Sequence, residues 1–240
     1  IEEYGLKDGN FSSILDTYVK ISNRAKEDES IDQKAFYYLQ QVESGNTEMV
    51  QKFKEITDIC VERQLQIFDT LDIHFDVFTH ESDFVYNNYL DNILKRLDKT
   101  GRLHEDELGR LYVDLSGYDI PTREPVLVLT RSNKTSLYPM RDIAYTIHKI
   151  ELNPKNNFIV LGEDQEVYMK QISAVLDILG YKAPKLISYS YVLLDGDKMS
   201  TSAGTVVLVT DFMKAVKNTL INEFNKRNSE ISVDKLNILV

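Results

Sequence analysis

Apolar residues in the first seventy positions recur at steps of three and four, and no stretch there alternates as a strand would. This spacing places apolar side chains on one face of an α-helix, so we expect a succession of helices. Gly45 is followed by Asn46 and Thr47, which offer a helix stop and a new N-cap. A helical hairpin is therefore predicted to turn near Gly45.

The pattern changes after this helical part. Residues 74–79 are typical of a short strand, residues 86–98 predict a helix that ends at Gly101, and residues 110–114 predict another strand. The first half of the chain therefore passes from helices alone to a mixture of helices and strands.

Strands and helices alternate in the second half. Strands are predicted over residues 125–130, 158–161 and 186–194, and helices over residues 141–150, 164–179 and from Asp211 onward. This alternation indicates an α/β fold with a parallel, doubly wound sheet, in which ligands bind at the carboxyl ends of the strands. The residues after two of these strands, 162–165 and 195–204, are therefore the first candidates for a site.

Charge and composition narrow the functional classes. The chain has 28 lysine and arginine residues against 38 aspartate and glutamate residues, a net charge of −10, which argues against binding to nucleic acid through a global basic field. Its apolar runs are far shorter than the roughly 20 residues of a membrane span, so no membrane partner is expected. The four histidines lack the spacing of metal ligands, and we expect no dedicated metal site.

The compartment is predicted from the cysteine content and the start of the chain. Cys60 is the one cysteine, so an internal disulfide is impossible, and no basic and apolar leader opens the sequence. Both features favour the cytoplasm. Ile1 is not an initiator, which indicates a fragment or a processed chain.

The loop of residues 195–204 has the composition of a phosphate-binding loop. Lys198 is a mobile cation, Ser200 and Thr201 supply hydroxyl and backbone donors, and Gly204 lets the chain fold over a ligand. The glycine frame of a P-loop is missing. Composition alone favours a solvated surface hairpin.

The order of residues in this loop supports a more specific functional prediction. Lys198-Met199-Ser200-Thr201-Ser202 resembles the Lys-Met-Ser-Lys-Ser signature loop of class I aminoacyl-tRNA synthetases. The resemblance implies that Lys198, Met199, Ser200 and Thr201 bind ATP, with Lys198 and Ser200 facing its phosphates during catalysis.

A second candidate lies at the start of the helix predicted near residue 141. Tyr138 and Asp142 are four residues apart and project from one helical face. A carboxylate accepts two hydrogen bonds from a guanidinium, and a phenol adds a third or stacks on it. From the residues alone, a core tyrosine and a carboxylate at a helix N-terminus are the simpler reading.

Two segments extend the resemblance to one family. Residues 137–144, Leu-Tyr-Pro-Met-Arg-Asp-Ile-Ala, are similar to the Tyr-x-x-Arg-Asp-Ile-Ala segment of arginyl-tRNA synthetases, which implies that Tyr138 and Asp142 bind arginine. Residues 160–165 resemble that family's Val-x-Gly-x-x-Gln element, which implies that Gln165 orients the amino acid.

The resemblance covers nearly the whole chain and is strongest over residues 126–209; residues 75–78 and Glu81-Ser82 extend it into the first half. It implies three parts. Residues 1–122 are helical and inserted segments of the catalytic region, residues 123–209 the second half of a split Rossmann-like catalytic domain, and residues 210–240 the start of a helical anticodon-binding domain.

The sequence also departs from the family. No pair of histidines forms the His-x-Gly-His motif of class I synthetases. Thr201 replaces the second lysine of the signature loop, and Ala203 stands where arginyl enzymes often have a basic residue. A loop with one cation stabilises phosphate charge less well unless another residue substitutes. We expect this chain to be an internal piece of a longer synthetase.

The implied function is that of an arginine–tRNA ligase, which activates arginine with ATP and transfers it to tRNA. Magnesium is expected to arrive with ATP, and the sequence does not indicate an oligomeric state. Two alternatives stay open: another class I synthetase, such as the class I lysyl type, or a non-catalytic domain of synthetase ancestry.

The chain of 240 residues alone is expected to form no aminoacyl-adenylate, because the motif that contacts the triphosphate is missing from it. The measurement is arginine-dependent exchange of pyrophosphate into ATP. Exchange clearly above the background without arginine would contradict this expectation.

Overall fold

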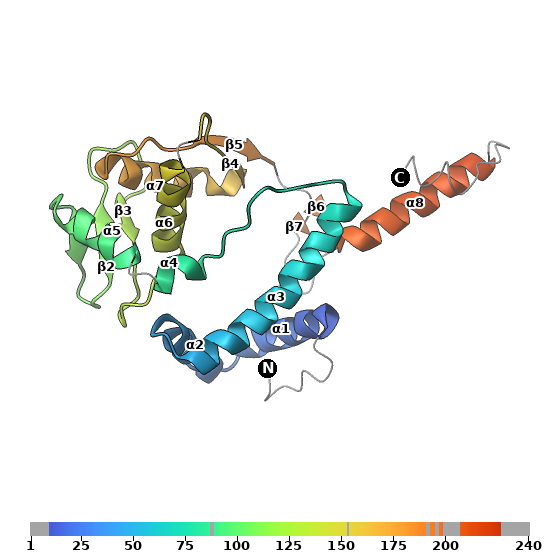
Figure 1. Ribbon diagram of the computed structural model, residues 1–240, viewed down its shortest axis with the longest axis horizontal. Coiled ribbons are helices and arrows are strands. Elements are labelled where there is room, and N and C mark those ends of the chain that lie inside the picture. The colour runs from blue at the N-terminus through green and yellow to red at the C-terminus, as the bar shows by residue number, and fades with distance from the viewer. Residues whose placement is uncertain are drawn as a thin grey trace. The chain divides into compact units, whose positions relative to one another are not determined.

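The computed structural model describes residues 10–86, 89–152, 154–190, 193–194, 197–198 and 207–226 (Figure 1). The chain divides into two compact units, each built from separate stretches of sequence. The helical unit takes residues 1–36, 51–76 and 193–240, and the α/β unit takes residues 37–50 and 77–192.

Three helices open the chain, as the apolar spacing predicts. They are α1 (Phe11–Ala25), α2 (Glu29–Glu43) and α3 (Thr47–Thr70). The predicted turn is confirmed: Gly45 has φ +81°, a left-handed conformation that glycine adopts without strain, and Asn46 Oδ1 accepts a hydrogen bond of 3.2 Å from the N–H of Met49.

The strand predicted over residues 74–79 is wrong. These residues are irregular and carry exposed apolar side chains, with Val77 70% exposed and Phe78 53% exposed. An extended segment becomes a strand only when a neighbour pairs with its backbone, and none of the described strands pairs with this one. The ring of Phe75 instead contacts that of Phe68 at the end of α3, with 5.2 Å between centroids.

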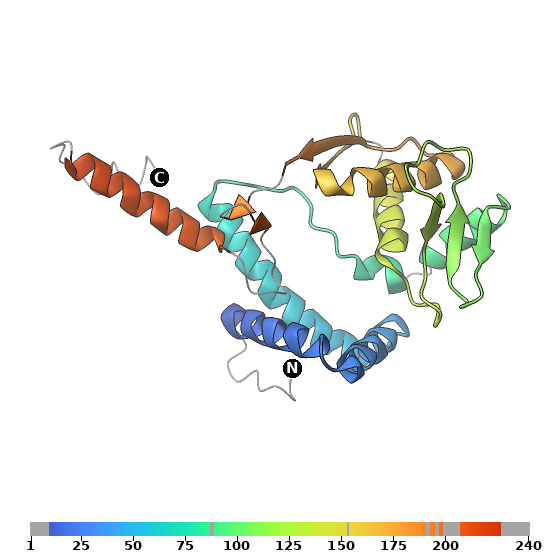
Figure 2. The ribbon, with the colours of Figure 1, turned by 180° about the vertical axis from the view of Figure 1, so that it is seen from behind.

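Two helices and an antiparallel sheet begin the larger part of the α/β unit. Helix α4 spans Ser82–Tyr86, and α5 spans Tyr89–Asp98. The sheet has the order β1–β2–β3, with β1 (Leu103–Glu105), β2 (Leu111–Asp114) and β3 (Val126–Val128). Val113 of β2 pairs with Leu103 on one side and with Leu127 on the other. Figure 2 shows the sheet beside α5.

The remainder of the unit is a βαβ arrangement preceded by a helix. Helix α6 (Tyr138–Glu151) leads to β4 (Phe158–Gly162), a 3₁₀ turn η2 (Glu163–Gln165), α7 (Glu166–Ile178) and β5 (Lys185–Tyr189). Strands β4 and β5 are parallel, which confirms the predicted α/β class. The carboxyl ends of the two strands meet, because Gly162 pairs with Tyr189.

The predicted strand over residues 186–194 is divided in the structure. It ends as β5 at Tyr189, and β6 (Leu193–Leu194) pairs in the antiparallel sense with β7 (Asp197–Lys198). Helix α8 (Val209–Lys226) follows. None of the described helices is long and apolar enough to cross a membrane.

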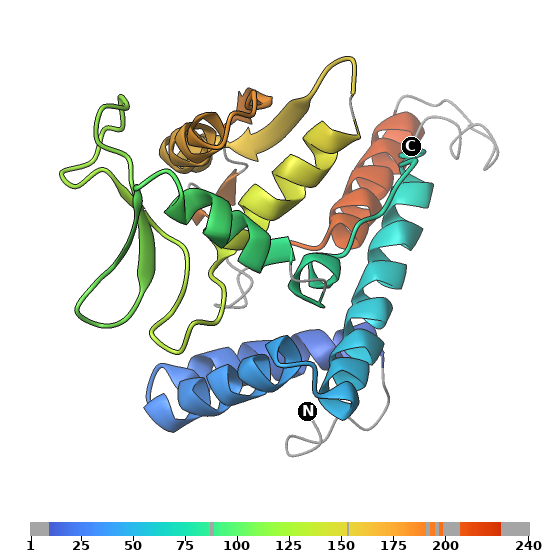
Figure 3. The same ribbon diagram turned by 60° about the vertical axis from the view of Figure 1, so that its left-hand side comes forward.

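The core of the α/β unit lies between its helices and strands. Figure 1 shows α6 and α7 below the β4–β5 pair in this view, and Figure 3 shows α5 beside α6. The outer side of the β4–β5 pair is exposed and apolar, since Phe158, Val160, Ile187 and Tyr189 are 49–60% exposed. The largest fully buried side chains are Leu97, Leu115, Leu129, Met140, Ile143, Ile147, Ile172, Leu176, Val113 and Val175.

Replacing Leu97 with alanine is expected to lower the free energy of unfolding by about 2–5 kcal/mol, because this side chain is 0% exposed and its loss leaves a cavity. The matched control is Leu108→Ala: Leu108 is 66% exposed, and its change should stay within about 0.5 kcal/mol. Urea unfolding followed by circular dichroism measures both. Equal losses in the two variants would contradict this core assignment.

Candidate functional site

The site predicted for the amino acid lies at the start of α6. Leu137 is the N-cap and makes no side-chain capping bond, and a proline stands in the first turn. Ile143 and Ala144 face the core at 0% exposure, so helical periodicity directs Tyr138 and Asp142 away from it. Tyr138 is 68% exposed, and Asp142 is half-buried.

Asp142 is held by a side chain of the neighbouring helix. The hydroxyl of Tyr168, in the first turn of α7, donates a hydrogen bond to Asp142 Oδ2. Burial, together with this hydrogen bond to a carboxylate, raises the pKa of the Tyr168 phenol well above its usual range. Tyr168 therefore stays protonated and serves as a neutral donor.

Arg141 is the centre of a second cluster beside Asp142. Its guanidinium carbon lies 5.0 Å from the centroid of the Tyr138 ring, a cation–π contact. Its Nε lies 3.0 Å from Glu81 Oε2 without the alignment of a hydrogen bond, and its Nη1 lies 3.7 Å from Glu43 Oε1. The side chains of Arg141 and Glu43 are each 14% exposed, so solvent weakens their attraction less than it would for an exposed pair.

Glu43 also fixes the loop that enters α6. Its two carboxylate oxygens accept hydrogen bonds from the backbone N–H and the hydroxyl of Ser136, each 3.0 Å long. The carbonyl oxygen of Ser136 accepts a further bond of 2.7 Å from Arg131 Nη1. The start of α6 is therefore positioned by residue 43, far away in the sequence.

The other predicted amino-acid contact lies at the carboxyl end of β4. Gln165 is the N-cap of α7, and its side-chain N–H donates to Asp164 Oδ2 at 2.9 Å. A Cβ at Gly162 would lie 2.8 Å from Asp164 Oδ1, so a larger residue there would displace this carboxylate. Ser190 donates to Glu163 Oε2 at 3.1 Å across the ends of β5 and β4.

A lysine near Asp142 completes the charged surroundings. Burial lowers the pKa of Lys149 from its usual value, and the negative charge of Asp142 opposes that change. The Lys149 ammonium lies 4.5 Å from the centroid of the Tyr145 ring. The Lys149 ammonium therefore makes a cation–π contact with another residue of α6.

The predicted residues are brought together only in part. Tyr138 and Asp142 lie one turn apart on α6 but take different partners, Arg141 and Tyr168. Gln165 and Tyr168 share the start of α7, so the Tyr168–Asp142 hydrogen bond joins the two predicted arginine-binding segments. Joint binding of one guanidinium by Tyr138 and Asp142 stays a prediction.

The predicted ATP-binding residues cannot be placed in the same way. Met199, Ser200 and Thr201 lie outside the described residues, and for Lys198 only the backbone is described, as the last residue of β7. Their roles stay predictions.

The sequence alone predicted no role for four residues of the site: Arg141, Glu81, Tyr168 and Glu43. Arg141 and Glu81 both fall in family-like segments, and Tyr168 comes three residues after Gln165, so closer attention to those segments could have found them. Glu43 has no such signal, because it meets Ser136 only through the fold.

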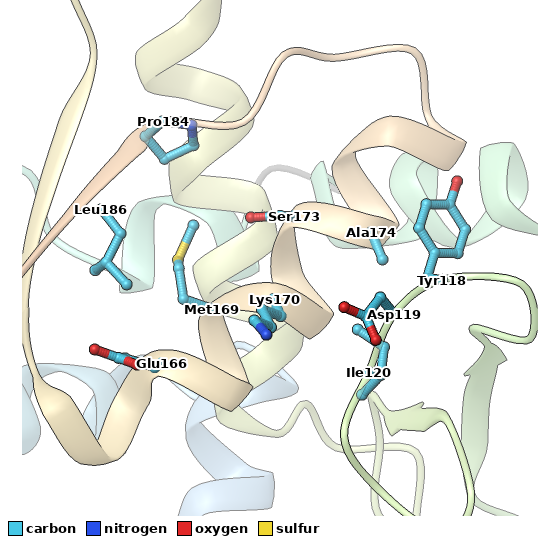
Figure 4. A pocket seen from close by; sticks show the side chains of 10 residues that line it. All are labelled: Tyr118, Asp119, Ile120, Glu166, Met169, Lys170, Ser173, Ala174, Pro184 and Leu186. Atoms are coloured by element: carbon cyan, nitrogen blue, oxygen red, sulfur yellow. The ribbon is translucent and has the colours of Figure 1, made fainter.

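A cavity of about 450 Å³ opens on another side of α7 (Figure 4). Its wall combines side chains of α7, such as Glu166 and Lys170, with Tyr118 and Asp119 of a loop and with Leu186 of β5. None of the predicted site residues lines it. Within the described ranges, no group of three or more histidine, cysteine or acidic residues is placed to hold a metal ion.

Comparisons with known proteins match most or all of the chain. A family model described as "tRNA synthetases class I (R), catalytic domain" covers residues 1–240. An arginine–tRNA ligase of Methanococcus aeolicus is 33% identical over 190 residues, which are 79% of this chain and 32% of that protein. Another, of Methanococcus maripaludis, is 32% identical over 229 residues, 93% of this chain and 39% of the relative.

A solved structure supports the fold. Thermus thermophilus arginyl-tRNA synthetase matches 98% of this chain and 45% of its own chain, with a TM-score of 0.69 and 20% sequence identity. The present chain spans about a third to two fifths of the length of the two curated relatives.

Glu43→Gln is expected to lower the free energy of unfolding by about 1–3 kcal/mol, because it leaves the largely buried Arg141 without this carboxylate and weakens the bonds to Ser136. Glu81→Gln is the matched control, since Glu81 faces the same guanidinium but is 50% exposed; its loss should stay below about 1 kcal/mol. Thermal unfolding of both variants gives the comparison. A larger loss of stability for Glu81→Gln than for Glu43→Gln would contradict the expected order of the two variants.

Proposed function

This chain belongs to the family of class I arginyl-tRNA synthetases, matched along its catalytic domain, and from this premise we propose that the protein joins arginine to tRNA. The observation that carries the proposal is the match of the family model to residues 1–240. The relatives named above are arginine–tRNA ligases, which favours arginine over lysine as the substrate.

The proposed reaction has two steps. A carboxylate oxygen of arginine attacks the α-phosphorus of ATP, pyrophosphate leaves, and arginyl-adenylate forms. A terminal ribose hydroxyl of tRNA then attacks the activated carbonyl carbon, and AMP leaves. Neither step needs a covalent bond to the protein, so the protein contributes positioning and charge stabilisation.

The chemistry of the α6 start supports a guanidinium as its ligand. Asp142 is a half-buried carboxylate next to an exposed phenol, Tyr138, one helical turn away. A carboxylate and a guanidinium match in geometry and charge, and partial burial strengthens their attraction. Gln165, at the carboxyl end of β4, would orient the amino acid, since its amide can both donate and accept hydrogen bonds.

The proposed nucleotide contacts come from the signature loop. Lys198 and Ser200 would face the phosphates of ATP, with Met199 and Thr201 contributing to the same binding site. Magnesium would enter with ATP, since the triphosphate itself supplies oxygen ligands.

The proposed domain organisation and cellular compartment follow from the family. Residues 1–122 would form helical and inserted segments, residues 123–209 the second half of the Rossmann-like domain, and residues 210–240 the start of an anticodon-binding domain, in a cytoplasmic enzyme. The net charge of −10 is compatible with a tRNA partner, because proteins also recognise RNA by shape and by its single-stranded ends.

The full-length gene product is expected to exchange pyrophosphate into ATP with arginine and not with lysine. Asp142→Asn should raise the KM for arginine roughly 10- to 100-fold, because a hydrogen-bonded charge partner of the guanidinium is lost. Asp119→Asn, in the cavity wall outside the proposed site, is the control and should leave this KM unchanged.

Two results would overturn the proposal. Preferential activation of lysine would assign the protein to another class I synthetase. A full-length product that activates no amino acid would favour the non-catalytic alternative.

A further inference from the structure

Tyr168 connects the two helices that carry the proposed arginine contacts. It lies in the first turn of α7, three residues after Gln165, and its hydroxyl donates to Asp142 Oδ2 on α6. Within the described part of the chain, the Tyr168 hydroxyl is the hydrogen-bond partner of this carboxylate. The bond therefore fixes the orientation of Asp142 and leaves Oδ1 for a ligand.

A phenol is suited to this task because it is neutral. A lysine or arginine in its place would also hold the carboxylate, but it would cancel the negative charge that attracts a guanidinium. Burial and the neighbouring Asp142 raise the pKa of Tyr168, so its hydroxyl keeps the proton that it donates. The carboxylate is thereby oriented without being neutralised.

The two cations near Asp142 also have close partners of their own. Arg141 faces Glu81 at 3.0 Å and Glu43 at 3.7 Å. Lys149 lies over the ring of Tyr145, at 4.5 Å from its centroid. The charge of Asp142 acts on Lys149, but the hydrogen bond to its carboxylate comes from Tyr168, so Oδ1 stays available to a ligand.

We propose that Tyr168 is a positioning residue for arginine, which orients the Asp142 carboxylate toward the guanidinium through a neutral hydrogen bond. This inference rests on the proposed function, because it takes Asp142 as an arginine contact. It adds that selection of the substrate depends on a residue of α7 that is itself not required to touch arginine.

The test is a double-mutant cycle in the full-length gene product, with Tyr168→Phe, Asp142→Asn and the combined variant. Steady-state pyrophosphate exchange gives kcat and the KM values for arginine and for ATP. Tyr168→Phe keeps the ring and removes one oxygen atom. It should raise the KM for arginine about tenfold and leave the KM for ATP within about twofold.

The combined variant separates positioning from packing. If Tyr168 acts through Asp142, removing its hydroxyl should have little further effect in the Asp142→Asn background, so the two changes are not additive. A purely structural role predicts additive losses, with the KM for ATP and thermal stability changed as well.

Tyr118→Phe is the matched control. The Tyr118 hydroxyl donates to Asp177 Oδ2 at 2.7 Å, and Asp177 lies in the last turn of α7, whereas Tyr168 lies in its first turn. The control therefore removes the same kind of bond, from a phenol to a carboxylate, at the other end of α7. Its KM for arginine should equal that of the unchanged protein.

The outcomes separate this inference from the proposed function. A raised arginine KM in Asp142→Asn with an unchanged KM in Tyr168→Phe, or additive effects in the cycle, would overturn the role of Tyr168 and keep the arginine site. An unchanged arginine KM in Asp142→Asn would instead overturn the proposed site itself.

Discussion

The candidate site depends on the burial of the apolar face of α6 within the same core as α7. Ile143 and Ile147 of α6 and Val175 and Leu176 of α7 are 0–1% exposed. Each such side chain contributes roughly 1.5–3 kcal/mol on burial, whereas a hydrogen bond contributes about 0.5–1.5 kcal/mol net. Apolar packing therefore sets the position of the two helices, and the bond between Tyr168 and Asp142 refines it.

The elements that were predictable from sequence are those with strong local signals. The helices before residue 70 and the turn at Gly45 follow from apolar spacing and from a glycine that adopts a positive φ. The parallel pairing of β4 and β5 follows from strands separated by a helix of suitable length. The segments around Asp142 and Gln165 indicated the family because their residues match its motifs, and the roles of these two residues stay predictions.

The features that sequence reasoning missed are decided by contacts between distant residues. Residues 74–79 have the composition of a strand but no pairing neighbour among the described strands. Glu43 meets Ser136 across 93 positions, and Tyr168 meets Asp142 across 26. No local pattern encodes such a meeting, because each of these residues alone has the features of an ordinary polar group on a helix or in a loop.

The outer side of the β4–β5 pair has a practical consequence. Phe158 and Val160 of one strand and Ile187 and Tyr189 of the next bring apolar side chains into contact with water on neighbouring strands. Contiguous surfaces of this kind promote self-association, and the attraction between them weakens on cooling. Any self-association through this face is therefore expected to be stronger in warm solution than in cold.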